Sequence, residues 1–240
     1  DAEQLTNISS GGAATPETLA ALYATKTAAA FPGGGWGMTE TLGTGAAFTG
    51  HFCSHRPMAS GFPSPIMEFS FLDEDGKPTP PGVAGEINVR SSAAIQRYHT
   101  GSSEDFYEGW LATGDVGYIN EEGLLFICGR VKDMIISGGY NIYPREIEDV
   151  IAEIPEVLEV AVMGIHDVEW GQRVTAMVTL VPNTTVDHAE LTTRILDHCK
   201  SRMASYKKPK DLRIVAEFPL NSTGKIAKKV LKQQLEAEGK

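Results

Sequence analysis

The pattern of apolar residues changes at residues 130–133, and this change constrains the fold more than any other feature of the sequence. Before it, segments such as 66–73 and 85–90 alternate apolar and polar residues, as half-buried β-strands do. After it, strand-like apolar runs alternate with segments of helical period. We therefore expect a mixed α+β chain with two domains, a β-rich one over 1–131 and a small α+β one over 132–240 with a central sheet and flanking helices.

The β-rich half is expected to open on a helix over 16–30, with Thr15 as its N-cap and Pro16 in its first turn. Residues 31–65 are dense in glycine and proline, which predicts loops carrying short strands. Residues 115–120 and 124–129 have the pattern of a hairpin. In the second half, strands are expected at 133–137, 157–165, 173–181 and 211–217, and helices at 144–154, at 187–200 and after Gly224.

Composition limits the class of protein. Of the 240 residues, 42% are apolar, which is enough for a core and excludes a wholly disordered chain. The three cysteines are odd in number and form no C-x-x-C pair, so we expect a reducing, cytoplasmic compartment instead of a disulfide framework. No run approaches the about 20 apolar residues of a membrane-spanning helix, and no signal peptide opens the chain. Secretion and an integral membrane segment are not expected.

Charge is distributed unevenly along the chain. Residues 1–199 carry 10 Lys and Arg against 27 Asp and Glu, whereas residues 200–240 carry 11 against 4. A body this acidic would repel a phosphate backbone, so nucleic acid is not an expected partner. The basic tail is interpreted either as the contact for a small anion or as an ordinary solvated helix face.

A first candidate site is the sequence GWGMTET at 35–41. The flat face of Trp36 can stack on a purine, and Thr39 can donate to a phosphate. Glu40 offers the hard oxygen that Mg²⁺ prefers when it is bound to phosphates. The alternative is a loop whose tryptophan only caps the core.

A second candidate combines Asp115, expected on a tight Thr-Gly-Asp turn, with Arg130 at the far end of the following hairpin. The carboxylate can accept hydrogen bonds from two vicinal hydroxyls, each worth about 1.5–3 kcal/mol, so a ribose is its natural ligand. The alternative is an ordinary aspartate in a β-turn, which Gly114 and Gly117 would also suit.

A third candidate is Lys225 in the sequence NSTGKI. This is not a phosphate-binding Walker A loop, because Leu220 stands where that motif requires glycine and Ile226 follows the lysine. A lysine on a loop can still act as a point charge aimed at a phosphate or an oxyanion. The H-x-C-x-H spacing of His51, Cys53 and His55 lacks a second ligand cluster, and no metal site is expected there.

In their order, these segments resemble the core motifs of the acyl-adenylate-forming superfamily, which includes acyl-CoA synthetases, coumarate-CoA ligases, firefly luciferases and peptide-synthetase adenylation domains. The matching segments are 9–13, 35–41, 85–90, 109–118, 129–148 and 221–226. By this resemblance, 1–131 is the β-rich end of a large adenylate-binding domain and 132–240 is the small mobile C-terminal domain.

The resemblance also implies roles for individual residues. Nucleotide contacts would come from Gly12 and Ala13 in the adenine pocket, from Trp36 with Gly37 and Met38, and from Asp115 and Arg130 at the ribose. Catalysis would involve Thr39, Glu40 with its Mg²⁺, and Lys225, which contacts the carboxylate and phosphate oxygens. Lys132 would be the hinge of the small domain, and Gly138 and Gly139 would line the tunnel for coenzyme A.

The implied activity is that of an ATP-dependent carboxylic acid–CoA ligase acting on a fatty or aryl acid, with AMP and pyrophosphate as products. The chain resembles only about the last two-fifths of such an enzyme and lacks the family's Pro-Lys phosphate loop. The isolated chain is therefore expected to be inactive without the missing N-terminal region, and a homodimer is left open. The alternatives are a non-catalytic module that binds a nucleotide or coenzyme A, and an adenylation domain that loads a carrier protein.

Overall fold

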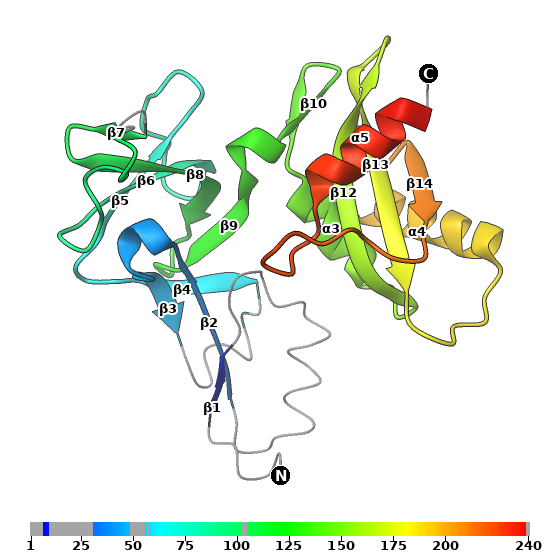
Figure 1. Cartoon of the computed structure of the whole chain (residues 1–240), viewed down its shortest axis with the longest axis horizontal. Helices are drawn as coiled ribbons and strands as arrows, with labels where there is room; N and C mark the ends of the chain where they lie inside the picture. Colours follow the sequence, from blue (N-terminus) through cyan, green and yellow to red (C-terminus); the bar gives the residue numbers. More distant parts are fainter. Residues whose placement is uncertain (1–6, 10–30, 49–55, 57, 102–104, 239–240) are drawn as a thin grey trace. The chain divides into compact units, whose positions relative to one another are not determined.

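The computed structural model describes residues 7–9, 31–48, 56, 58–101 and 105–238 (Figure 1). Tertiary contacts divide the chain into two compact units, Asp1–Val131 and Lys132–Lys240, which we call unit 1 and unit 2. The helix expected over 16–30 lies outside the described residues. The α+β class expected from the sequence is confirmed, with one sheet in the described part of each unit.

The described part of unit 1 is a sheet with two short 3-10 helices. Its strands follow the order β1-β2-β3-β4-β9-β8-β6-β5, and β7 pairs with β8. Only β1 and β2 pair in parallel among these described strands. The elements are β1 (Asn7–Ser9), β2 (Phe31–Gly37), η2 (Thr39–Thr41), β3 (Gly45–Phe48), β4 (Ala59–Pro63), β5 (Glu68–Leu72), β6 (Gly85–Arg90), β7 (Phe106–Tyr107), β8 (Trp110–Ile119), β9 (Leu125–Arg130) and η3 (Val131–Asp133), which runs into unit 2.

The short strands expected within 31–65 are confirmed as β2, β3 and β4. Alternation in β6 places Ile87 and Val89 on one face, where both are fully buried with Leu111 and Leu125. Partly buried Trp36 packs against the same cluster. The core of the sheet therefore packs directly against Trp36, the aromatic residue of the first candidate site.

The turn expected at Thr113–Asp115 is wrong, because these residues lie inside β8. Gly114 adopts a positive φ of 68°, and the register between β6 and β8 shifts between Glu86 and Asn88. This is a β-bulge, in which one strand carries extra residues and its side chains are redirected. The hairpin partner remains as expected, since Asp115 pairs with Arg130 in the ladder of β8 and β9.

Unit 2 is a sheet of order β11-β10-β13-β12, with β14 paired to β13, and three described helices (Figure 1). Every strand and helix expected in this half is present, with ends shifted by a few residues. The short β11 was not expected, since Ile142 is its one buried residue. The elements are β10 (Ile135–Ser137), β11 (Tyr140–Ile142), α3 (Pro144–Ala152), β12 (Val157–Asp167), β13 (Gly171–Leu180), α4 (His188–Arg202), β14 (Asp211–Ile214) and α5 (Lys228–Glu238).

Helices cover both faces of this sheet. Val162 packs with α3 and α4 on one face, whereas its neighbours Ala161 and Met163 pack with α5 on the other. A strand buried on both faces reads as a continuous apolar run, which explains the sequence of β12. Burial raises the pKa of Cys199 in α4 to about 11, so this thiol stays protonated within the core.

One carboxylate links the two helical layers. Glu148 of α3 accepts a hydrogen bond from the backbone N–H of Val162 in β12 at 2.8 Å, and its Oε1 also lies 2.5 Å from Nζ of Lys228 in α5. The strand β12 lies at the end of the sheet order, so Glu148 satisfies a donor that no neighbouring strand reaches. The first turn of α5 is thereby held at the edge of the sheet.

We expect Glu148→Ala to lower the free energy of unfolding by about 1.5–3 kcal/mol, because one carboxylate serves both an ammonium group and a backbone donor. Urea unfolding followed by circular dichroism measures this change. Glu169→Ala is the control, since Glu169 is an exposed glutamate in the turn between β12 and β13 of the same unit. A change within 0.5 kcal/mol of the control would contradict the prediction.

The helices described here offer no membrane crossing, because none of them is both long and apolar enough.

Candidate functional site

Three side chains from three strands of unit 1 meet at one point. Trp36 of β2 donates from its indole Nε1 to Oδ2 of Asp115 in β8 at 2.8 Å. Arg130 of β9 donates from Nε to Oδ1 of the same carboxylate at 2.7 Å. We call these residues the Trp–Asp–Arg cluster. It brings together the first and second candidates of the sequence, which lie 79 residues apart.

The Asp115 carboxylate is held firmly and is still usable by a ligand. Its side chain is 13% exposed, against 46% for Arg130. The hydroxyl of Thr113 accepts from the backbone N–H of Asp115 and donates to the carbonyl of Ile87, which anchors the bulge. A carboxylate has about four acceptor positions, so each oxygen can accept a further hydrogen bond beyond the one it receives from Trp36 or Arg130.

The indole of Trp36 is seated between β3 and β5. Its ring lies 5.8 Å from that of Phe69, centroid to centroid, at an interplanar angle of 55°. Gly45 of β3 lies so close that a Cβ there would stand 2.7 Å from Cε3 of the indole. Gly45 and Phe69 are therefore supporting residues that sequence reasoning missed, since no local pattern relates them to Trp36.

The polar residues that follow Trp36 lie on η2. Thr39 is exposed and Glu40 is half-buried, and the helix is capped by a hydrogen bond from the Thr41 hydroxyl to the carbonyl of Met38. Gly37 must lack a side chain, because a Cβ there would lie 2.5 Å from the carbonyl oxygen of Gly43. This tight turn presents Thr39 and Glu40 immediately beyond the end of β2.

Glu40 is held by the segment that follows β6. The Tyr98 hydroxyl donates to Oε1 of Glu40 at 3.4 Å, and the backbone N–H of Ile95 donates to its carbonyl at 2.8 Å. Burial, followed by the charges of Glu40 and Asp105, raises the pKa of Tyr98, so the phenol keeps its proton at neutral pH. Sequence reasoning missed Tyr98, which no motif marked.

A single carboxylate of this kind fits Mg²⁺, which is held by one or two carboxylates plus phosphate oxygens and water. In the described ranges, no group of three or more His, Cys, Asp and Glu side chains is arranged to hold a metal ion by itself. His51, Cys53 and His55 lie outside these ranges, as do Gly12 and Ala13.

In unit 2, Lys225 lies on a closed loop before α5. A β-bridge joins Leu220 to Ile226, and Oδ1 of Asn221 accepts hydrogen bonds from Thr223 and from the backbone N–H of Lys225 at 2.9 Å. The Lys225 side chain is exposed. The loop therefore fixes the backbone of this lysine while its ammonium group stays accessible.

Gly138 and Gly139 join β10 to β11, both with positive φ. A Cβ on Gly138 would stand 2.9 Å from Cε3 of Trp170, which is itself covered by Nζ of Lys210 at 3.0 Å from the ring centroid. Next to the glycines, the ring of Tyr140 stacks on that of Tyr206 at 4.4 Å. The glycine loop is thus surrounded by exposed aromatic rings and a lysine.

Lys132, the predicted hinge, is exposed in η3 at the division between the units.

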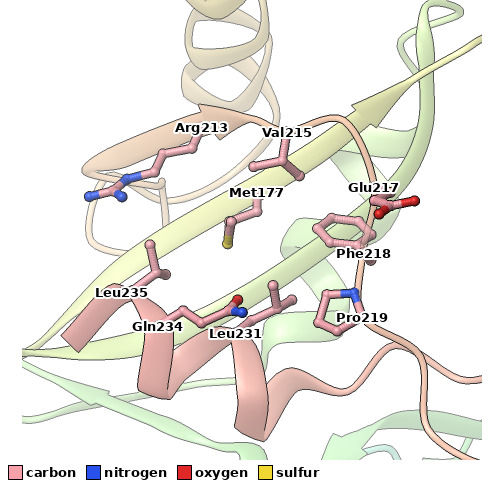
Figure 2. A pocket seen from close by; sticks show the side chains of 9 residues that line it. All are labelled: Met177, Arg213, Val215, Glu217, Phe218, Pro219, Leu231, Gln234 and Leu235. Atoms are coloured by element: carbon pink, nitrogen blue, oxygen red, sulfur yellow. The ribbon is translucent and has the colours of Figure 1, made fainter. Parts of the chain in front are cut away.

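A pocket of about 350 Å³ lies between α5 and strands β13 and β14 (Figure 2). Its floor is apolar, with Met177 at the centre of the view and Leu231 and Leu235 below it. Arg213 at its rim is ion-paired with Asp211 at 3.4 Å. The predicted site residues do not line this pocket, which is bounded by Met177, Arg213, Val215, Glu217, Phe218, Pro219, Leu231, Gln234 and Leu235.

Two family models match the chain. Residues 1–99 match the model of AMP-binding enzymes, and residues 146–225 match that of the AMP-binding enzyme C-terminal domain. Among curated relatives, the long-chain-fatty-acid–CoA ligase FadD13 of Mycobacterium tuberculosis is 35% identical over 240 residues, which cover 99% of this chain and 46% of the relative. The 2-succinylbenzoate–CoA ligase of Bacillus licheniformis is 35% identical over 195 residues, covering 80% and 39%.

Solved structures give the same picture. An anthranilate CoA ligase in complex with anthranoyl-AMP is 30% identical, with a TM-score of 0.86 over 98% of this chain and 45% of that one. The o-succinylbenzoate CoA synthetase of Bacillus subtilis, in complex with its acyl-adenylate intermediate, is 32% identical, with a TM-score of 0.82 over 96% and 46%. This chain spans less than half the length of these relatives.

Proposed function

The chain belongs to the adenylate-forming superfamily of AMP-binding enzymes, and we propose that it is the C-terminal portion of an ATP-dependent carboxylic acid–CoA ligase. In the first half-reaction, a carboxylate oxygen attacks the α-phosphorus of ATP and the bond to pyrophosphate breaks. In the second, the thiolate of coenzyme A attacks the acyl carbon and AMP leaves. The other product is the acyl-CoA thioester.

The Trp–Asp–Arg cluster is the observation that carries this proposal. The indole face of Trp36, continued by Gly37 and Met38, would stack on the adenine, and Asp115 would accept from the two ribose hydroxyls. Arg130 donates to the other oxygen of this carboxylate and helps to hold it in place. A nucleoside requires a flat face for its base and, beside it, an acceptor for its two vicinal hydroxyls. Trp36 and Asp115 offer this combination.

The reacting phosphates are assigned to the residues that follow. Thr39 would donate to a phosphate oxygen, and Glu40, held by Tyr98, would bind the Mg²⁺ that accompanies ATP. Bound there, Mg²⁺ would neutralise charge on the phosphates. Gly12 and Ala13 are proposed to complete the adenine pocket.

Unit 2 would supply the groups specific to each half-reaction. Lys225 would stabilise the charge that develops on the carboxylate and phosphate oxygens. Unit 2 would then rotate about Lys132, as mobile domains do between chemical steps, and present Gly138 and Gly139 to coenzyme A. The exposed rings of Tyr140, Tyr206 and Trp170 suit the nucleotide end of that substrate, and Lys210 suits its phosphates.

The acid is proposed to be a fatty or an aryl carboxylic acid. The similar proteins include ligases named for long-chain fatty acids, indoleacetate, 2-succinylbenzoate and anthranilate. A cytoplasmic enzyme and a homodimer stay predictions. The isolated chain is proposed to be inactive, since the rest of the nucleotide site and most of the acyl pocket would come from the N-terminal region.

The first experiment is the intact mass of every polypeptide in the native sample, followed by pyrophosphate exchange with a panel of acids. A polypeptide well above 25.9 kDa that exchanges pyrophosphate with one class of acid supports the ligase. Transfer of the acyl group to a carrier protein instead of coenzyme A, with release of AMP, favours the carrier-loading alternative. Binding of a nucleotide by the complete polypeptide without exchange favours the non-catalytic module.

We expect Gly138→Val to slow thioester formation from a supplied acyl-adenylate by about tenfold or more, while adenylation changes little. The added side chain would meet Trp170 and narrow the approach of the thiol, and small displacements of reacting groups are costly. Each half-reaction is measured separately in the complete protein, so adenylation reports on folding. Gly76→Val, at a glycine of similarly positive φ in an open turn of unit 1, is the control for the backbone strain that a side chain causes at such a position. An equal loss in both half-reactions would contradict the proposal that Gly138 lines the tunnel for coenzyme A.

A further inference from the structure

The two oxygens of Asp115 are each held by a different donor. Arg130 reaches Oδ1 from the neighbouring position of the β8–β9 ladder, so its placement follows from strand pairing. Trp36 reaches Oδ2 from β2, a strand that does not pair with β8. Because the terminal torsion of an aspartate is broad, one donor leaves the plane of the carboxylate free to turn, whereas two donors fix it.

The donor on Trp36 is separate from its stacking face. Phenylalanine and tyrosine also present a flat face to a base, but neither carries an N–H group at the indole position. The ring of Trp36 is seated against Phe69 and against the bare Cα of Gly45, which aims the indole nitrogen at Asp115. The environment of Trp36 thus favours the hydrogen bond as well as the stacking face.

We propose that Trp36 is a positioning residue, whose indole N–H orients the Asp115 carboxylate toward the ribose hydroxyls and so sets the preference for ribonucleotides over deoxyribonucleotides. This inference rests on the proposed function, because it places a ribose at Asp115. It differs from a stacking role, which acts equally on nucleotides with and without the hydroxyls.

The test compares ATP with 2′-deoxy-ATP and 3′-deoxy-ATP in pyrophosphate exchange by the complete protein. For Trp36→Phe, which keeps a flat face, we expect the preference for ATP in kcat/KM to fall about fivefold to tenfold, mainly through weaker use of ATP. In Asp115→Ala the preference disappears, and adding Trp36→Phe to that variant changes it no further. Trp110→Phe, in the same sheet, is the matched control and keeps the wild-type preference.

The outcomes separate two failures. If Trp36→Phe lowers the rates with all three nucleotides by one common factor, Trp36 serves only as a face for the base and the inference is wrong. Trp36→Leu, which also lacks a side-chain donor, answers the same question if the phenylalanine variant does not fold, because the loss of its flat face affects all three nucleotides alike. Calorimetric titration of the wild type with AMP and 2′-deoxy-AMP is the second readout. If neither nucleotide binds, the proposed nucleotide site itself is overturned.

Discussion

Lys225→Ala is expected to slow the adenylation half-reaction by about 10²–10³-fold, because a fixed cation placed where negative charge develops is typically worth that much. Leu220, Asn221 and Ile226 close a loop that fixes the backbone of Lys225. Only the side chain of the lysine would then have to be ordered when its ammonium group contacts the reacting oxygens. Acyl-CoA formation from a supplied acyl-adenylate should change little, since the role proposed for the lysine is limited to the first half-reaction.

The two half-reactions are measured separately in the complete protein, by pyrophosphate exchange and by release of AMP from the supplied adenylate. Lys229→Ala is the matched control, since Lys229 is an exposed lysine in the first turn of α5. Lys225→Arg keeps the charge with another geometry and should recover only part of the rate. Equal losses in both half-reactions would contradict the role assigned to Lys225.

Asp115→Ala is expected to raise the Kd for AMP by about 10²-fold or more, because the two hydrogen bonds proposed between the ribose and this carboxylate would be lost together. Arg130 and Trp36 also lose their common acceptor, so the variant disturbs both neighbours of the ligand. Asp115→Asn keeps one acceptor oxygen and should fall between the alanine variant and the wild type.

Isothermal titration of the complete protein with AMP measures these affinities, and thermal unfolding shows whether the variants fold. Asp75→Ala is the control, since Asp75 lies in an exposed turn of the same unit and pairs only with Lys77 among the described residues. Binding of AMP by Asp115→Ala with the affinity of the wild type would remove Asp115 from the nucleotide site.

Local pattern accounts for most of the regular structure. The alternation in 85–90 predicted β6, and the apolar run at 157–165 predicted β12. Asp187 was expected to open α4, and it caps that helix by accepting from the backbone of Glu190. Such predictions succeed because side-chain period and capping depend on residues within a few positions of one another.

The failures have a common cause as well. Glycine beside aspartate at 113–115 is typical of a turn, and only the pairing of β8 with β6 makes the same residues a bulge. Tyr98 contacts Glu40 across 58 residues, and no local pattern relates the two. The strand β11 has three residues, which are too few to show the alternation of apolar and polar residues that marks a strand.

By itself, the sequence determined the class of fold and the position of most strands and helices, and it marked Trp36, Asp115 and Arg130 as candidates for a nucleotide site. Only the tertiary structure decided that Trp36 and Arg130 both donate to the carboxylate of Asp115. It also decided that Gly45 and Phe69 pack against the indole and that Tyr98 contacts Glu40. The reason is physical: residue types and their spacing set local conformation, whereas a hydrogen bond between residues 79 apart depends on the order in which distant strands pair.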